Sequence, residues 1–273
     1  MTKKTTSSSE STERDVVLDD LGGALARHEF FLVYQPEIDL RTNAFAGVEA
    51  LIRWRHRGEG IINPARFVSE LETTGLIVDV GRWALETACL QGAQWHSRGY
   101  RFPVSVNISD RQFARSEFVG DIDDVLRSSR FASTLLVLEF AQRTLLDHED
   151  AHHRLDALRE MGVRIAIDDF IPSASQLADV RALPVDIVKL DRQFVASLHN
   201  APADVSPMHE LVALARAANV QIVASGIEDA EQRRWLQLED VMIGQGYLFS
   251  KPHEAEEIDQ FLEDFSIFSG KPL

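Results

Sequence analysis

The chain has 273 residues, of which 45% are apolar and 8% aromatic, enough to build one large domain or two small ones. Its 43 acidic and 28 basic residues give a net charge of −15, which argues against general binding to a nucleic-acid backbone, although metal ions held by carboxylates would still allow a phosphate ligand. No apolar run is long enough to span a membrane, and the single cysteine, Cys89, predicts a disulfide-free cytoplasmic protein.

A polar stretch precedes the first apolar pattern. Met1 to Arg14 is rich in Lys, Ser, Thr and Glu and lacks the apolar run of a signal peptide. We therefore predict a disordered tail over residues 1–15 and one folded domain over residues 16–273.

Short apolar runs rich in β-branched residues predict eight strands along the domain. In chain order they cover residues 31–38, 47–54, 104–108, 135–140, 163–170, 185–191, 220–228 and 241–247. Helical spacing or helix-boundary residues mark segments between them, at 16–30, 63–71, 80–95, 116–128, 148–161, 208–219 and 254–265. Gly162 is expected to end the 148–161 helix, because glycine readily adopts the left-handed conformation of a helix C-cap.

Strands and helices that alternate in this way over about 250 residues are typical of a (β/α)₈ barrel, an α/β fold whose active site lies at the carboxyl ends of its strands. A doubly wound open sheet is the alternative fold. Such a sheet would not bring every strand end to one centre.

Polar residues occur at or near the ends of most predicted strands. Asp168 and Asp169 close the 163–170 strand, and an isolated pair of this kind would most simply cap the next helix. The same position is polar on other strands, however, and the full set comprises Glu49, Asn107, Glu139, Asp168, Asp169, Lys189, Glu228 and Gln245. A barrel would gather these side chains on one face.

Four acids and an amide are oxygen ligands suited to Mg²⁺ or Mn²⁺. A pair of such ions, about 3.5–4 Å apart, could activate water for in-line attack on a phosphodiester. Lys189 could then neutralise phosphate charge or position the water. Alternatively, the acids form an ion-pair network with Arg53 and Lys189 that only supports the barrel.

Ordered motifs along most of the chain resemble those of the EAL domains, the cyclic di-GMP phosphodiesterase family. The tripeptide Glu49-Ala50-Leu51 is followed directly by Ile52-Arg53-Trp54. Other matches in family order and spacing are Tyr34-Gln35-Pro36, Val106-Asn107-Ile108-Ser109, Leu138-Glu139, Ile167-Asp168-Asp169-Phe170, Val188-Lys189-Leu190-Asp191, Gly226-Ile227-Glu228 and Gln245-Gly246-Tyr247-Leu248-Phe249-Ser250. The resemblance implies a modified TIM-like barrel, often with an antiparallel first strand, that hydrolyses cyclic di-GMP to linear pGpG with two Mg²⁺ or Mn²⁺ ions.

The resemblance also assigns roles to residues of this chain. It implies that Lys189 contacts the attacking water, and that Asp169 binds a second metal ion or bridges the two. The ligands of the first metal would be Glu49, Asn107, Glu139 and Asp168. The dinucleotide pocket would be lined by Gln35, Leu51, Arg53, Gln245 and Tyr247.

Three departures from the family pattern bear on catalysis. Ser225 stands where active members carry the first glutamate of Ala-Glu-Gly-Val-Glu, and serine has too high a pKa to act as a general base without activation. The loop at 171–176 lacks both family glycines and contains Pro172, so we expect it to follow another path. Gln142 replaces the glutamate that steadies this loop in the family.

These departures lead to three hypotheses. The first is a degenerate EAL domain that binds cyclic di-GMP, or a partner protein, with weak or absent hydrolysis. The second is an active phosphodiesterase in which Glu228 or another acid compensates for the missing glutamate. The third is a protein-interaction module that has lost nucleotide binding. The family resemblance also implies dimerisation through barrel helices.

Overall fold

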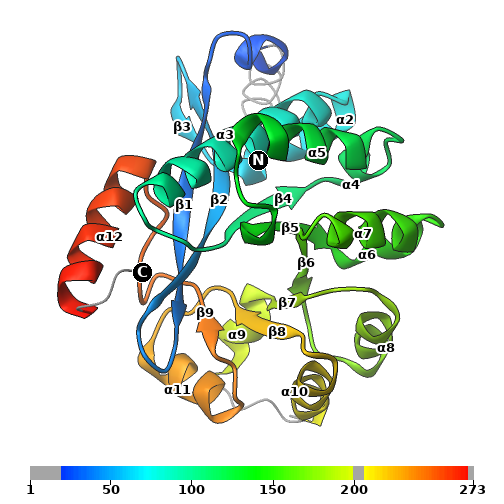
Figure 1. Ribbon diagram of the computed structural model, residues 1–273, viewed down its shortest axis with the longest axis vertical. Helices are drawn as coiled ribbons and strands as arrows, with labels where there is room; N and C mark the ends of the chain where they lie inside the picture. Colours follow the sequence, from blue (N-terminus) through cyan, green and yellow to red (C-terminus); the bar gives the residue numbers. More distant parts are fainter. Residues whose placement is uncertain (1–19, 199–205, 270–273) are drawn as a thin grey trace, which may run out of the picture.

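The computed structural model describes residues 20–198 and 206–269 of the chain (Figure 1). The tail predicted over residues 1–15 lies outside the described residues. Within them, no helix is both long and apolar enough to cross a membrane.

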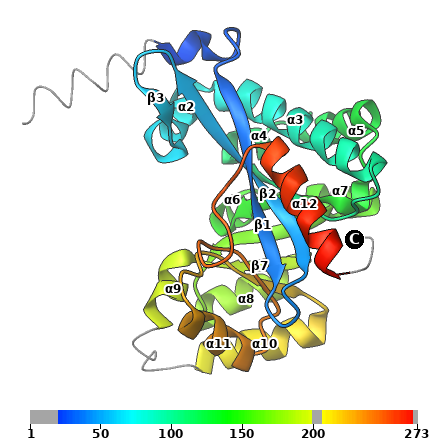
Figure 2. The same ribbon diagram turned by 90° about the vertical axis from the view of Figure 1, so that its left-hand side faces the viewer.

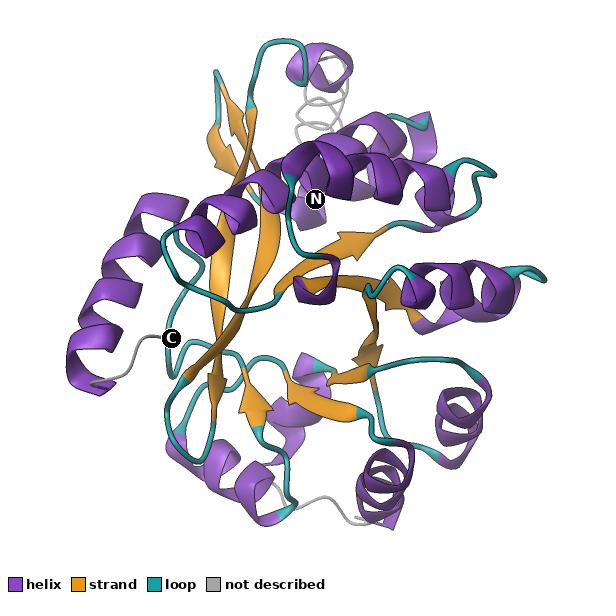
Figure 3. Ribbon diagram, viewed as in Figure 1, coloured by secondary structure: helices purple, strands orange, loops and turns teal. Residues whose placement is uncertain are grey.

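A ring of strands surrounded by helices dominates the structure (Figure 3). The strands of the described chain are β1 Phe30–Asp39, β2 Phe45–His56, β3 Gly60–Ile62, β4 Val104–Ile108, β5 Leu136–Ala141, β6 Arg164–Phe170, β7 Ile187–Leu190, β8 Gln221–Ala224 and β9 Ile243–Gly244. β1 pairs with both β9 and β2, which closes eight strands into a barrel, while β3 pairs only with β2. The (β/α)₈ prediction is confirmed, and the open sheet is excluded.

The first strand runs against its neighbours. β1 is antiparallel to β2 and to β9, whereas the successive pairs from β2 through β4 to β9 are parallel. The reversed first strand is the modification that the family resemblance implies.

Helices cover the outside of the barrel (Figure 2). In the described residues they are α2 Val68–Thr74, α3 Ile77–Ser97, α4 Asp110–Phe113, α5 Phe118–Ser129, α6 Gln142–Asp147, α7 Ala151–Glu160, α8 Ala174–Ala182, α9 Arg192–Ser197, α10 Ser206–Ala218, α11 Ala230–Leu238 and α12 Ala255–Ser269, with short 3₁₀ turns at Pro64–Arg66 and Ser133–Leu135. Gly162 follows α7 with φ +90°, as the C-cap prediction requires.

Three predicted helices differ from the structure. The helix expected over 63–71 is a 3₁₀ turn at Pro64–Arg66 followed by the separate helix α2. The helix expected over 16–30 ends at Ala24, because His28 adopts φ +56° and Phe30 already pairs with Trp54 in the sheet. The helix expected over 148–161 begins at Ala151, since His148 is extended. The short elements β3, α4, α6, α8, α9 and α11 were not predicted.

Apolar side chains fill the space between the strands and their helices, and a smaller apolar cluster lies inside the barrel. The inner cluster takes one residue from each of five neighbouring strands, namely Val137, Ala166, Ile187, Val223 and Ile243. Because successive side chains of a strand point to opposite faces, the residues two positions further along each strand also point inward. That alternation sets the position of the polar site.

Candidate functional site

A polar layer lies directly above the apolar layer inside the barrel. Two positions beyond the members of the inner cluster, the five strands carry Glu139, Asp168, Lys189, Ser225 and Gln245. Glu49 joins the layer from β2 and lies opposite Gln35 of β1 in the sheet register. The structure therefore brings together residues that are up to 210 positions apart in the chain.

The Lys189 ammonium is the centre of this layer. Its Nζ donates to Glu49 Oε2 at 2.8 Å and to Glu139 Oε1 and Oε2 at 2.7 and 2.8 Å. Asn107 Nδ2 donates to Glu49 Oε1 at 2.8 Å, and Gln245 Nε2 donates to Glu49 Oε2 at 2.9 Å. The two glutamates are thus held by one cation and two amides.

Gln245 also reaches the first strand, and glycine makes this approach possible. Its Nε2 donates to Gln35 Oε1 at 2.8 Å, while Gln35 Nε2 donates to the Ser250 carbonyl at 3.2 Å. The next residue, Gly246, has φ +159°, and a Cβ there would lie 2.0 Å from the Ile227 carbonyl oxygen. A side chain at position 246 would therefore displace the backbone that presents Gln245.

Burial and charge together shift the pKa values of the centre. Burial and the neighbouring Glu49 carboxylate raise the pKa of Glu139 well above its usual value. Burial opposes the charged form of Lys189, but the carboxylates of Glu139 and Glu49 raise its pKa overall, so the ammonium stays protonated. Two carboxylates share one buried cation, which leaves the centre short of positive charge.

Asp168 and Asp169 lie at the end of β6, and their side chains point in different directions. The pairing of β6 with β7 is irregular between Ile167 and Phe170, and Asp169 adopts φ +52° within that irregularity. Asp168 is the more buried of the two, and burial raises its pKa to about 6. Burial, followed by the charge of Asp191, raises the pKa of Asp169. A nearby cation would stabilise the ionised form of both carboxylates.

The site contains oxygen atoms of the kind that bind a hard divalent cation. Carboxylate and amide oxygens of Glu49, Asn107, Glu139 and Asp168 surround one region, and the buried Gln245 Oε1 has no hydrogen-bond partner. In the part of the chain that the structure describes, however, no three acidic, histidine or cysteine side chains converge as a metal-binding group. Metal binding therefore requires Glu49 and Glu139 to exchange contacts with Lys189 for contacts with the ion.

A pocket of about 640 Å³ opens beside this centre, a volume within the usual range of small-molecule sites. We call it the upper pocket. Glu49, Leu51, Asn107 and Asp169 line it from the barrel side, and residues of α2 and α3 form the opposite wall. Four of the predicted site residues thus share one cavity.

The other eight predicted site residues do not line this cavity. Five of them belong to the polar layer and its contact with β1, namely Gln35, Glu139, Asp168, Lys189 and Gln245. The remaining three lie elsewhere. Arg53 is half-buried and donates from Nη1 to the Ile52 carbonyl at 2.8 Å, and Tyr247 is 56% exposed, with the Arg192 and Lys251 cations 6.0 and 5.7 Å from its ring centre. Glu228 is exposed and accepts a hydrogen bond from Arg192 Nη2 at 2.6 Å. This ion pair turns Glu228 toward the surface instead of the polar layer.

Ser225 lies immediately after β8, and its hydroxyl is buried without a hydrogen-bond partner. Its backbone N–H donates to the Leu190 carbonyl at 3.2 Å, which anchors the residue beside β7. A buried polar atom without a partner is uncommon in a protein interior. The Ser225 side chain therefore lies in the polar layer without a hydrogen bond to any described residue.

The altered loop is fastened by amide side chains. Gln142 Nε2 donates to Asp179 Oδ2 of α8 at 2.7 Å, and the Ile171 N–H donates to Gln176 Oε1 at 3.0 Å. Ser173 caps α8 by accepting from the Gln176 N–H at 3.4 Å. Loop 171–176 thus has its own set of bonds without the family's two glycines.

One buried acid of the barrel interior was not predicted. Glu37 lies beside Glu139 and Lys189 in a small inner cavity of about 60 Å³, and burial raises its pKa. Its distance of two residues from Gln35 along β1 places both on the inward face. This alternation could have identified Glu37 from sequence.

The chain was compared with known proteins. The EAL domain model matches residues 18–252. MucR of Pseudomonas aeruginosa, a bifunctional diguanylate cyclase/cyclic di-GMP phosphodiesterase, is 36% identical over 244 residues, which cover 89% of this chain and 36% of MucR. The cyclic di-GMP phosphodiesterase PdeR of Escherichia coli is 32% identical over 247 residues, covering 90% of this chain and 37% of PdeR.

A solved structure of the PaMucR phosphodiesterase in complex with c-di-GMP superposes with a TM-score of 0.84 at 36% sequence identity, covering 89% of this chain and 99% of that one. The fold and site thus define a modified β/α barrel with a carboxylate–lysine centre above its inner apolar layer. The chain belongs to the EAL domain family. It spans about a third of the length of the curated relatives it matches.

Proposed function

We propose that this domain binds cyclic di-GMP in the upper pocket and hydrolyses it weakly or not at all. The names and bound ligand of its relatives support cyclic di-GMP as the ligand. The cavity supports a small-molecule ligand, because its volume of about 640 Å³ lies within the usual range of such sites and it opens beside Glu49 of the polar layer, with Asn107 and Asp169 in its lining. Arg53, with no ion-pair partner in the described residues, is available as a cation for a phosphate.

The buried, unpartnered hydroxyl of Ser225 is the observation that carries the second half of the proposal. A general base contributes about 10²- to 10⁴-fold to a rate, and an unactivated serine hydroxyl cannot act as one near neutral pH. Glu228 does not take over this role, because its carboxylate is paired with Arg192 at the surface.

Metal binding is part of the proposal. Glu49, Asn107, Glu139 and Asp168 would hold one Mg²⁺ or Mn²⁺ ion, and Asp169 would face a second. A bound ion would supply positive charge to phosphate oxygens and activate water. The chain's own residues would then position the ligand: Leu51, Gln35 and Gln245 from the barrel interior and Tyr247 from the rim.

Calorimetric titration of cyclic di-GMP with and without Mn²⁺ tests the binding. We expect saturable binding that Arg53→Gln weakens by about tenfold, as expected for loss of one charge-assisted hydrogen bond. Arg127→Gln on α5 is the matched control, because Arg127 is exposed and pairs only with Asp123 and Asp124 there. An absence of heat and an unchanged melting temperature would contradict nucleotide binding and favour a protein-interaction module.

An active phosphodiesterase is the alternative, favoured by the intact set of acids around Lys189. Product analysis separates the two functions. Rapid formation of pGpG by the unmodified chain would support the alternative.

A further inference from the structure

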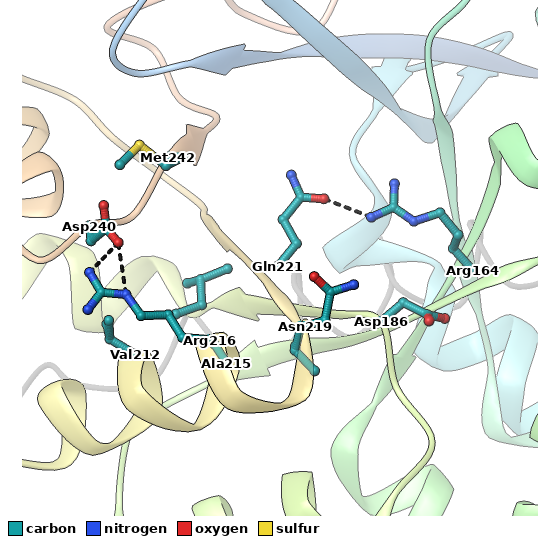
Figure 4. A pocket seen from close by; sticks show the side chains of 11 residues that line it. Arg164, Asp186, Val212, Ala215, Arg216, Asn219, Gln221, Asp240 and Met242 are labelled. Atoms are coloured by element: carbon teal, nitrogen blue, oxygen red, sulfur yellow. Dashed lines mark hydrogen bonds and ion pairs between the residues drawn. The ribbon is translucent and has the colours of Figure 1, made fainter.

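Figure 4 shows the side chains that line a second pocket, which we call the basal pocket. This pocket lies at the opposite end of the barrel from the polar layer. Its volume of about 430 Å³ lies within the range of small-molecule sites. Arg164 and Gln221 are the first residues of β6 and β8, and Met242 precedes β9. The pocket thus lies at the strand starts, away from the strand ends that carry Glu139, Asp168 and Lys189.

The same alternation that builds the polar layer places charge at the base. Arg164 and Gln221 come two positions before Ala166 and Val223 of the inner apolar cluster, so both point into the barrel from below. Arg164 Nη2 donates to Gln221 Oε1 at 2.7 Å across the intervening strand β7. Both residues line the basal pocket and also the small inner cavity beneath Lys189.

Two arginines, Arg164 and Arg216, line the basal pocket. Arg164 has no carboxylate within ion-pair distance in the described residues. Asp186 instead accepts from the Ile165 N–H at 2.9 Å and from Arg159 at 3.2 Å. Asp240 is paired with Arg216. On its inner side Arg164 lowers the pKa of Glu37, although burial raises that pKa overall. In the described residues the guanidinium donates only to Gln221, so its other N–H groups have no protein acceptor there.

The remaining wall combines amide and apolar groups. Asn219 and Gln221 supply amides, while Val212, Ala215 and Met242 supply an apolar surface from α10 and the start of β9. Figure 4 shows the Arg164–Gln221 pair on one side of the cavity and the Arg216–Asp240 pair on the other. A planar fork of donors beside an apolar wall suits a carboxylate or phosphate group attached to a small apolar body.

We propose that the basal pocket is a second ligand site, which binds a small organic carboxylate or phosphate ester through Arg164. Its anionic group accepts from the guanidinium, with Gln221 alongside, and its apolar part lies against Val212 and Met242. This site does not depend on cyclic di-GMP binding, because it shares no lining residue with the upper pocket.

NMR titrations of the full chain with phenyl phosphate and with benzoate, at constant ionic strength, test the site. We expect saturable shifts of the amide resonances of residues 219–222. The probe with the higher affinity shows whether the site prefers a phosphate ester or a carboxylate. Arg164→Gln should weaken binding by at least about tenfold, the loss expected for a charge-assisted hydrogen bond. The matched control Arg127→Gln should bind as the unmodified chain does.

A second variant keeps the test independent of any folding defect in Arg164→Gln. Val212→Phe fills the pocket but retains Arg164 and Gln221, and it should also abolish the shifts. The proposal is overturned if neither probe gives saturable shifts at these residues below about 10 mM, the weak limit of specific ligand binding. Unchanged affinity in Val212→Phe, or in a folded Arg164→Gln, would equally overturn it.

Discussion

The centre and the rim of the polar layer differ in how fully their side chains are bonded. At the centre, Lys189 makes three short contacts with two glutamates, and amides hold Glu49 from two further sides. At the rim, Ser225 makes no side-chain bond, and loop 171–176 depends on amides in place of glycines. The comparison teaches that the bonding of the layer is uneven: the centre is fully bonded, whereas the Ser225 hydroxyl is not. This difference is the reason that the proposed function joins ligand binding to weak hydrolysis.

Removing the central cation should have the largest effect. Lys189→Met leaves Glu49 and Glu139 buried without a positive charge, so we expect the unfolding free energy of the metal-free protein to fall by about 3–5 kcal/mol. Urea denaturation measures this change. Arg127→Met, which breaks only exposed pairs, should cost less than about 1 kcal/mol. Equal losses of unfolding free energy in the two variants would show that Lys189 stabilises the protein no more than an exposed ion pair does.

The raised pKa of Asp168 predicts a pH dependence. Because its folded-state pKa of about 6 exceeds the usual 3.8, its contribution to stability is full below the unfolded-state pKa and is lost as pH rises through about 6. Asp168→Asn should therefore stabilise the metal-free protein, relative to the unmodified chain, by on the order of 1–2 kcal/mol at pH 8. Chemical denaturation at pH 4 and pH 8 measures the difference.

The same carboxylate should link metal binding to pH. If Asp168 is a metal ligand, as we propose, Mn²⁺ would bind its ionised form, so the Mn²⁺ affinity should fall as pH decreases through about 6. Asp168→Asn should remove this component and lower the affinity throughout. A pH-independent Mn²⁺ affinity in the unmodified chain would argue against Asp168 as a ligand.

The rim should respond more weakly. Gln142→Glu replaces the bond to Asp179 with two facing carboxylates, and we expect a loss of about 1 kcal/mol in unfolding free energy together with faster amide exchange in loop 171–176. Adding Asp179→Asn restores a donor and should recover most of the loss. If the double variant is no more stable than Gln142→Glu, the contact does not hold the loop.

The strands and the inward polar residues could be predicted because alternation and strand ends are local features of the sequence. Asp168, Lys189 and Gln245 therefore lie in the layer where the pattern placed them. Glu37 was missed because it lies in none of the family motifs, and only its spacing of two residues from Gln35 places it on the inward face of β1. The bond between Gln142 and Asp179 joins two separate elements, and such contacts depend on packing that no local pattern specifies.

The boundaries of short elements were also beyond a local pattern. His148 interrupts a run that reads as one helix, and β3 has only three residues, whose pairing with β2 determines its structure. Tyr247 was expected in the nucleotide pocket but is mostly exposed beside Arg192 and Lys251. In each case contacts with distant residues determine the outcome.

Formation of pGpG by the unmodified chain and by Ser225→Glu, measured side by side with Mn²⁺, tests the central claim most directly. We predict slow or undetectable turnover in the unmodified chain and a gain of about 100-fold or more in Ser225→Glu, because the substitution restores a carboxylate where a general base would stand. Ser225→Gln, of similar size but without the charge, should show no gain. Turnover on the order of 1 s⁻¹ or faster in the unmodified chain, unaffected by Ser225→Glu, would contradict the account.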